Sequence, residues 1–140
     1  MNSKMFALSA LFAAGVSISN GLAAAEPALY KVVEGHKVDA ATLGGWRAWR
    51  ALACERCHGA QQEGLVGPSL LQSLRQLSQE QFAQAVLNGR PEKGMPTFSN
   101  SKMLTDNIAG LYAYLKGRSD GAIQDGRLEP LAGEELQVKQ

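Results

Sequence analysis

The pentapeptide Cys54-Glu55-Arg56-Cys57-His58 constrains this chain more than any other stretch. Two cysteines separated by two residues and followed directly by a histidine form the C-x-x-C-H pattern, through which a haem of the c type is attached. In that arrangement the two thiols bond covalently to the porphyrin and the histidine ligates the iron. Since these are the only two cysteines in the sequence, the chain cannot build a four-cysteine zinc or iron–sulfur site by itself.

Three other interpretations of the cysteine pair compete with haem attachment. A redox dithiol of the thioredoxin kind should follow a strand and open a helix in a βαβ unit, whereas the residues before Cys54 have a helical pattern. The pair could also form a structural disulfide, or half of a metal site shared between two chains. Neither of these needs a histidine at the next position, so haem attachment is the interpretation that uses the cysteines and the histidine together.

The first 25 residues have the pattern of a secretory signal peptide. Lys4 gives a short positive region, residues 5–18 form a nearly uncharged apolar run, and residues 23–25 are three alanines that fit the small-x-small cleavage pattern. A membrane anchor would need roughly 20 apolar residues, so we predict cleavage before Glu26 and a mature chain without a membrane span. Export predicts a periplasmic location, which agrees with the motif because bacteria attach c-type haem outside the cytoplasmic membrane.

At 140 residues the chain has room for one domain. After the signal peptide we expect an N-terminal extension over residues 26–39, the domain over residues 40–118, and a C-terminal tail over residues 119–140 that has no hydrophobic period and should be mobile. Lysine and arginine number 14 against 13 aspartates and glutamates, and removal of the signal peptide takes away only Lys4. A near-neutral chain without a basic stripe is not typical of a nucleic-acid binder.

Two helices are predicted at the ends of the domain. The first begins at a cap on Asp39 or Thr42 and runs to about Ala53. The last follows Thr105 and ends before Gly117. Their apolar stripes, which we expect to pack against each other, consist of Trp46, Trp49 and Ala53 in the first helix and of Ile108, Leu111, Tyr112 and Leu115 in the last.

A further helix is predicted between these two. Ser78 and Gln81 have the spacing of a capping box, and Leu77 and Phe82 have the spacing of a hydrophobic staple. The helix should end at the asparagine–glycine pair of residues 88–89.

Two loops carry candidate ligating groups. Pro68 lies ten residues beyond His58, and its carbonyl is a candidate to accept the hydrogen bond that a metal-bound histidine gives from its other ring nitrogen. Pro96 disfavours helical geometry at Met95. The thioether of Met95 can therefore project from an extended loop, and it is a suitable soft ligand for haem iron. Arg90, in the same loop, is a candidate for contact with a haem propionate.

His36 and Met103 are the rival ligands. His36 is the only histidine outside the motif, but it stands in a loop beside a glycine and a lysine, where an exposed histidine is the simpler interpretation. Met103 falls just before a predicted helix, among residues expected in the core. Most methionines fill cores, and this alternative applies to Met95 as well.

Residues 40–118 resemble the class I c-type cytochromes. The resemblance is carried, in chain order, by the helix, C-x-x-C-H, the Gly-Pro loop, the second helix, the Gly-Met-Pro loop and the closing helix with Tyr112. The resemblance implies an all-α fold, with three main helices around one covalently bound haem c. By this resemblance Cys54 and Cys57 would attach the haem. His58 and Met95 would ligate its iron, and Pro68 would orient His58, the proximal ligand.

One departure from the family's spacing concerns the contact between the first and last helices. In many class I cytochromes a glycine stands eight residues, and an aromatic residue four residues, before the first cysteine. Here Gly45 and Trp49 stand nine and five residues before Cys54. The departure leaves the detail of the helix–helix contact open, although it does not affect the haem site.

A narrower resemblance is carried by residues 30–35, 37–39 and 45–50. These segments are similar to small periplasmic cytochromes of the PedF type, which accept electrons from quinoprotein (pyrroloquinoline quinone-dependent) alcohol dehydrogenases. The resemblance implies a carrier of single electrons rather than an enzyme, with such a dehydrogenase as donor and an oxidase or another cytochrome as acceptor. Two alternatives stay open, namely a haem-bearing subunit of a larger oxidoreductase and a haem sensor or enzyme with an open sixth site.

Overall fold

The computed structural model describes residues 28–124 and 126–134, so the predicted signal peptide lies outside the described residues. The longest elements are the helices α1 (Ala40–Ala51), α4 (Gln79–Asn88) and α5 (Lys102–Ser119). Single turns form α2 (Glu55–His58), α3 (Leu70–Ser73) and the 3-10 helix η1 (Pro91–Lys93). The short strands are β1 (Val32–Val33), β2 (Lys37–Val38) and β3 (Glu129–Pro130). The chain is mainly helical as predicted. The prediction of an all-α fold with three main helices did not include the single-turn helices or the small sheet.

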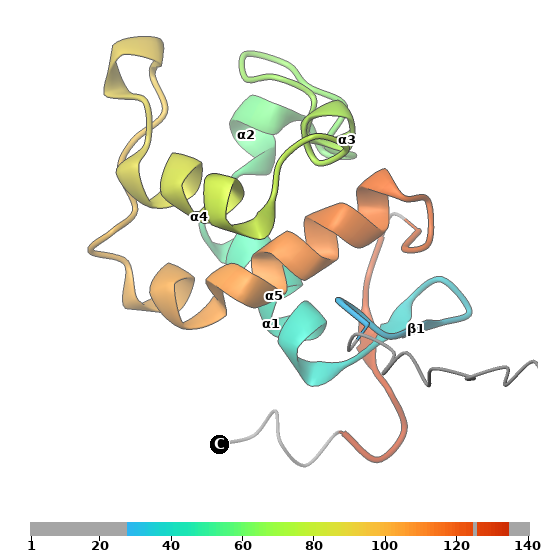
Figure 1. Ribbon diagram of the computed structural model, residues 1–140. Coiled ribbons are helices and arrows are strands. Elements are labelled where there is room, and N and C mark those ends of the chain that lie inside the picture. The colour runs from blue at the N-terminus through green and yellow to red at the C-terminus, as the bar shows by residue number, and fades with distance from the viewer. Residues whose placement is uncertain (1–27, 125, 135–140) are drawn as a thin grey trace, which may run out of the picture.

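Helices α1 and α5 cross at the centre of the fold (Figure 1). At the crossing, a Cβ on Gly45 would lie 2.0 Å from the backbone carbonyl carbon of Gly110. A Cβ on Gly110 would lie 2.0 Å from the carbonyl oxygen of Ala41. Real Cβ atoms essentially never approach a heavy atom so closely, so the backbones can meet only because both positions are glycine. The unusual spacing between Gly45 and Cys54 left the helix–helix contact open in the sequence. The structure shows that Gly45 makes this contact.

The starts of α1 and α4 were predicted correctly because their caps are local. The Asp39 carboxylate accepts a hydrogen bond from the Thr42 backbone N–H over 2.9 Å. At α4, the Ser78 hydroxyl accepts from the Gln81 backbone N–H over 3.2 Å, and the Gln81 side chain accepts from the Ser78 N–H over 3.0 Å. Each cap satisfies N–H groups that have no partner inside the helix.

Helix α5 is longer than predicted at both ends. It begins after Ser101, whose hydroxyl accepts a hydrogen bond from the Leu104 N–H, rather than after Thr105. It also continues through Gly117, where a Cβ would lie 2.5 Å from Cδ1 of Ile123. A glycine often marks the end of a helix, but this one makes room for a side chain that packs onto the helix.

The N-terminal extension and the C-terminal segment meet in a sheet of order β1-β2-β3, in which β1 pairs antiparallel and β3 parallel with β2. Beyond α5, Ile123 and Leu128 are only 1% and 3% exposed. The Glu134 carboxylate accepts a hydrogen bond of 2.6 Å from the Ala40 N–H at the start of α1. The prediction of a mobile tail is therefore wrong for the residues that pack here, while the division of the chain into extension, domain and tail stays a prediction.

The core is centred on α5, which packs against α1, α3 and α4. The Phe82 and Tyr112 rings contact each other with centroids 5.4 Å apart, and the Tyr112 hydroxyl donates a 2.8 Å hydrogen bond to the Leu77 carbonyl. The other large buried apolar side chains of the core cluster are Leu43, Trp49, Leu74, Leu104, Leu111, Tyr114, Leu115, Ile123 and Leu128. None of the helices in the described ranges is long and apolar enough to cross a membrane.

Candidate haem site

The C-x-x-C-H motif follows a tight reversal at the end of α1. The Cys54 N–H donates to the Trp49 carbonyl over 3.3 Å, and the Ala53 N–H donates to the Arg50 carbonyl over 3.2 Å. Ala53 has a φ of +51°. The two hydrogen bonds and this φ define a Schellman motif, in which alanine takes the left-handed position that usually holds glycine. The chain then enters the α2 turn, in which the His58 N–H donates to the Cys54 carbonyl over 3.0 Å.

The loop after the motif holds the His58 ring. Nδ1 of His58 lies 2.9 Å from the carbonyl oxygen of Pro68. A carbonyl can only accept a hydrogen bond, so Nδ1 carries the hydrogen and the lone pair of Nε2 is left for a metal. Gly67 packs directly on the ring, because a Cβ at this position would lie 2.8 Å from Cε1. The geometry thus selects one tautomer and one orientation of the imidazole.

His58 lines a cavity of about 470 Å³, which is within the usual range of roughly 300–1,000 Å³ for cofactor pockets. Cys54, Cys57 and Met95 line the same cavity. Its walls are mainly apolar and come from α1, α3, α4, α5 and the loops, through Trp49, Leu70, Leu77, Phe82, Val86, Phe98 and Leu111. Two thiols, one imidazole and one thioether therefore converge on a space that suits a flat apolar cofactor.

The charged residues that line this cavity are all basic. They are Arg56, Arg90 and Lys93, and the described lining contains no aspartate or glutamate. A haem carries two propionate carboxylates, which basic side chains can pair with. The charge of the lining therefore fits haem, while the specific contact of Arg90 with a propionate stays a prediction.

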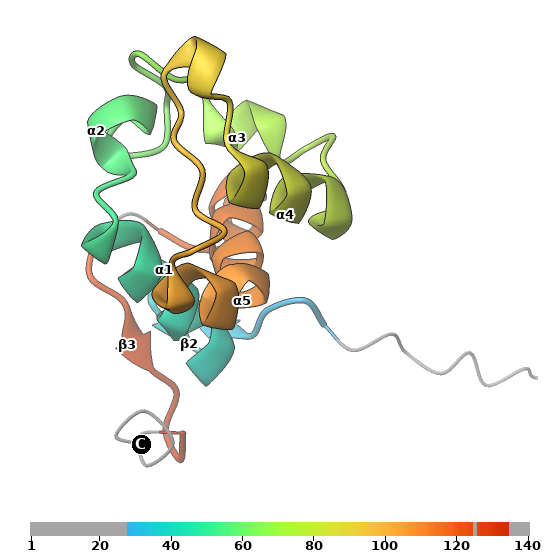
Figure 2. The same ribbon diagram turned by 90° about the vertical axis from the view of Figure 1, so that its left-hand side faces the viewer.

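Met95 is placed by a small closed loop. The Arg90 N–H donates to the Met95 carbonyl over 2.8 Å, and the Met95 N–H donates to the Arg90 carbonyl over 3.1 Å. Inside the loop, Gly94 has φ of +83° and its N–H donates to the Pro91 carbonyl over 3.0 Å. In Figure 2 the segment from η1 to α5 is seen between α2 and α4. Backbone bonds within the chain therefore hold Met95 at the cavity.

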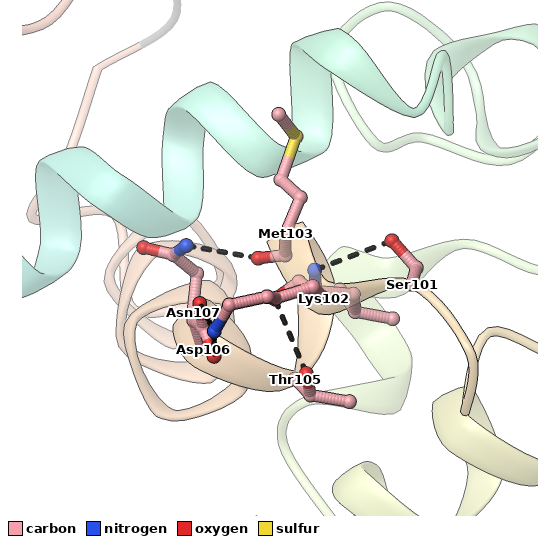
Figure 3. A network of polar contacts seen from close by, with 7 residues as sticks. Ser101, Lys102, Met103, Thr105, Asp106 and Asn107 are labelled. Atoms are coloured by element: carbon pink, nitrogen blue, oxygen red, sulfur yellow. Dashed lines mark hydrogen bonds and ion pairs between the residues drawn. The ribbon is translucent and has the colours of Figure 1, made fainter.

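Neither rival ligand lines the cavity. Met103 lies in the first turn of α5 and is 49% exposed (Figure 3). His36 lies in the turn between β1 and β2, with Nδ1 2.8 Å from the Glu34 carbonyl oxygen. The geometry thus brings together His58 and Met95 and leaves the other two away from them.

The two thiols have different environments. Burial, together with the negative charge of Glu55, raises the pKa of the Cys54 thiol to about 11, whereas Cys57 is exposed. The motif follows the helix α1 rather than a strand, so it lacks the βαβ context of a thioredoxin-like redox dithiol. Neither cysteine is in a disulfide. In the part of the chain that the structure describes, no group of three or more histidine, cysteine and acidic side chains is arranged to hold a metal ion.

Two features near the site were missed by sequence reasoning. The Trp49 ring, expected only in the core, lies 6.5 Å from the His58 ring and 6.4 Å from the Tyr114 ring. Gln62, in the glycine-rich loop, is 2% exposed. Helical period could place Trp49 on the inner face of its helix but could not show what it contacts, and no signal in the sequence marks Gln62 as buried.

Comparison with known proteins agrees with this site. Residues 40–115 match the family model described as "Cytochrome C oxidase, cbb3-type, subunit III". Cytochrome c-555 of Methylococcus capsulatus is 46% identical over 93 residues, which are 66% of this chain and 74% of the relative. Cytochrome c-553I of Paracoccus denitrificans is 33% identical over 105 residues, which are 70% of this chain and 46% of the relative.

A solved structure shares the fold. The crystal structure of the c-type cytochrome XoxG from Methylobacterium extorquens AM1 aligns with a TM-score of 0.66 and 32% sequence identity, over 79% of this chain and 73% of that chain. The fold and the site thus define a small helical protein that binds one haem covalently and carries electrons. The chain belongs to the c-type cytochromes, in class I. The predicted resemblance to class I c-type cytochromes and the predicted haem c cofactor are therefore confirmed.

Proposed function

We propose that this chain is a periplasmic monohaem electron carrier in which Cys54 and Cys57 form the thioether bonds and His58 and Met95 ligate the iron from opposite sides. The observation that carries the proposal is the convergence of these four side chains on one apolar cavity. Haem bound in this way supplies one-electron chemistry. The residues of the chain fix the imidazole tautomer, hold the thioether in place and surround the cofactor with a mainly apolar wall.

Two chain-derived axial ligands distinguish a carrier from a haem enzyme or sensor. If His58 and Met95 fill both positions, a substrate or gas has no free position at the iron. The closed loop that ends at Met95, with backbone hydrogen bonds of 2.8 and 3.1 Å to Arg90, supports a ligand that stays in place during electron transfer. In this proposal the protein does not catalyse a reaction of its own.

The ligand assignment is tested with Met95→Ala, with Met103→Ala as the matched control. Axial ligand choice moves haem potentials over about 0.8 V, and methionine raises the potential. Met95→Ala should therefore keep the covalent haem, lower the reduction potential strongly and lose the sulfur-to-iron charge-transfer band. Met103→Ala should retain both the potential and the band. An intact band in Met95→Ala would rule out Met95 as a ligand.

For the electron donor we propose a quinoprotein alcohol dehydrogenase, with an oxidase or another cytochrome as acceptor. The support is the similarity of residues 30–35, 37–39 and 45–50 to PedF-type cytochromes. The test is stopped-flow mixing of the oxidised holoprotein with purified periplasmic dehydrogenases. Rapid haem reduction by a quinoprotein alcohol dehydrogenase, but not by unrelated dehydrogenases, is expected. Absence of reduction by that enzyme would overturn the assignment.

A second candidate function is a haem-bearing subunit of a larger oxidoreductase. It is favoured by the family description, which names an oxidase subunit. The two candidates differ in how the protein purifies from its native membrane and periplasmic fractions. A carrier should elute as a free monomer, whereas a subunit should co-elute with other chains after mild extraction.

A further inference from the structure

Gln62 combines burial with an unusual backbone conformation. Its side chain lies in a loop four residues after His58, yet the residue is only 2% exposed. Its φ is +63°, a left-handed conformation that glutamine seldom adopts. Such a conformation persists where the surroundings over-determine it, and residues of this kind cluster near functional sites.

The side chain of Gln62 ties the loop to the C-terminal half of α5. Its Oε1 accepts a 2.7 Å hydrogen bond from Nε of Arg118, and its Nε2 donates to the Tyr114 hydroxyl over 3.3 Å. Nε2 also lies 3.3 Å from the Ala60 carbonyl, to which it donates. Arg118 is held in turn, because its Nη1 donates to the Ile123 carbonyl over 3.0 Å. The amide is thus anchored to a helix that belongs to the core.

The backbone of Gln62 closes the loop that orients His58. The Gln62 carbonyl accepts a 2.9 Å hydrogen bond from the Leu70 N–H, and the Gln62 N–H donates to the Gly59 carbonyl over 3.1 Å. Pro68, whose carbonyl accepts from Nδ1 of His58, lies between residues 62 and 70. A single buried residue therefore fixes both ends of the segment that presents the acceptor to the proximal histidine.

We propose that Gln62 is a positioning residue that sets the strength of the hydrogen bond from His58 to Pro68 and thereby the reduction potential of the protein. The proposal rests on the proposed function, with His58 as the proximal ligand. A strong hydrogen bond from Nδ1 makes the imidazole more basic, which favours the ferric iron. Loosening of the loop weakens this bond, so the ferric form loses stability and the reduction potential rises.

The experiment measures two quantities on ferric and ferrous holoprotein, the reduction potential and the rate at which the Nδ1 proton of His58 exchanges with solvent. Gln62→Met keeps the length of the side chain but removes the three hydrogen bonds of its amide, which join it to Tyr114, Arg118 and Ala60. We expect the exchange rate to rise at least threefold. The equilibrium constant for electron exchange with a reference donor should also change at least threefold toward the reduced form, which is about 28 mV at roughly 59 mV per tenfold change.

Thr42→Val is the matched control. Thr42 is also buried, at 0% exposed, and its hydroxyl donates a 2.8 Å hydrogen bond to Asp39 at the start of α1, outside the cavity lining. This variant should lose stability without any change in potential or exchange rate. Arg118→Lys provides a second route, because it keeps the positive charge but loses the Nε donor that Gln62 accepts from. It should shift both quantities in the same direction as Gln62→Met, and it decides the question if Gln62→Met does not fold.

The outcomes separate this proposal from the ligand assignment. A wild-type spectrum without a haem-shifted His58 imidazole would refute His58 as the ligand. A wild-type spectrum that shows this signal, together with unchanged potential and exchange in both Gln62→Met and Arg118→Lys, would refute the positioning role alone. Equal shifts in Thr42→Val would also overturn the proposal, because they would trace the effect to general loss of stability.

Discussion

The contact between α1 and α5 makes a sharp prediction, because two adjacent glycines of α1 have different surroundings. Gly45→Ala places a Cβ 2.0 Å from the Gly110 carbonyl carbon, 2.1 Å from its oxygen and 2.2 Å from the Leu111 nitrogen. Gly44→Ala places a Cβ 2.3 Å from Oδ1 of Asn107 and 3.5 Å from its Cγ. The first contact is with fixed backbone and the second is with the tip of a side chain that can rotate.

The magnitudes follow from two opposing effects. Alanine is favoured over glycine in a helix interior by about 0.8–1.0 kcal/mol, and both variants gain this amount. Overpacking a close contact costs about 1–3 kcal/mol, and Gly45→Ala should lie at the upper end because three backbone atoms obstruct its Cβ. Gly44→Ala needs only a rotation of Asn107, whose amide donates to the Met103 carbonyl over 2.8 Å (Figure 3). The variants should therefore differ by about 2–3 kcal/mol in the free energy of unfolding.

The assay is guanidinium denaturation of the ferric holoproteins, followed by far-ultraviolet circular dichroism. Gly44→Ala should unfold at the same denaturant concentration as the wild type or at a higher one, and Gly45→Ala at a clearly lower one. Because the two variants share the same helix and the same propensity gain, their difference reports the cost of the backbone contact at Gly45 relative to the side-chain contact at Gly44. Equal midpoints for the two variants would refute the argument that backbone contact at Gly45 requires glycine.

Three further outcomes are expected. Ala53→Gly should raise the free energy of unfolding by roughly 0.5–1 kcal/mol, because the left-handed conformation at φ of +51° suits glycine; a lower stability would contradict the Schellman assignment. Ser78→Ala should lower it by about 1 kcal/mol through loss of the capping box, which urea denaturation can measure. Burial would raise the pKa of Asp39, but hydrogen bonds from Lys31 and Thr42 outweigh it and hold this pKa below its usual range. A lowered pKa in the folded state stabilises the protein above the unfolded pKa of about 3.9, and this contribution is lost as the pH falls through the folded value. Asp39→Asn should therefore lose less stability in acid than the wild type, and identical acid titrations followed by circular dichroism would count against this account.

The parts of the site that were predictable rest on local rules. C-x-x-C-H is a contiguous chemical signature, and Pro96 restricts the backbone of Met95 from the next position. Asp39 and Ser78 cap helices within three residues of themselves. Each of these statements needs only a few neighbouring residues, so a single sequence contains the required information.

The parts that were not predictable depend on contacts between distant residues. In the sequence, Thr105 followed by an acidic residue fits a helix start as closely as Ser101 does. Only the fold shows which of the two begins the helix. Gly117 lies inside its helix, where the absence of a side chain makes room for Ile123. The burial of Gln62 depends on Arg118, which lies 56 positions later. A local sequence pattern cannot show which distant residues meet. The contacts that support the haem site from behind His58 were therefore visible only in the structure.

The sheet has a consequence for the order in which this protein can form. β2 lies between β1 and β3. Its pairing with β3 is parallel and places Lys37 opposite Glu129. The β1–β2 hairpin joins residues that are close in sequence, whereas β3 is separated from β2 by all of the helices from α1 to α5. Contacts between residues so far apart in sequence form slowly. We therefore expect the β1–β2 hairpin to form before β3 pairs with it, so that the backbone of Val38 gains its hydrogen bond from the Leu131 N–H late in folding.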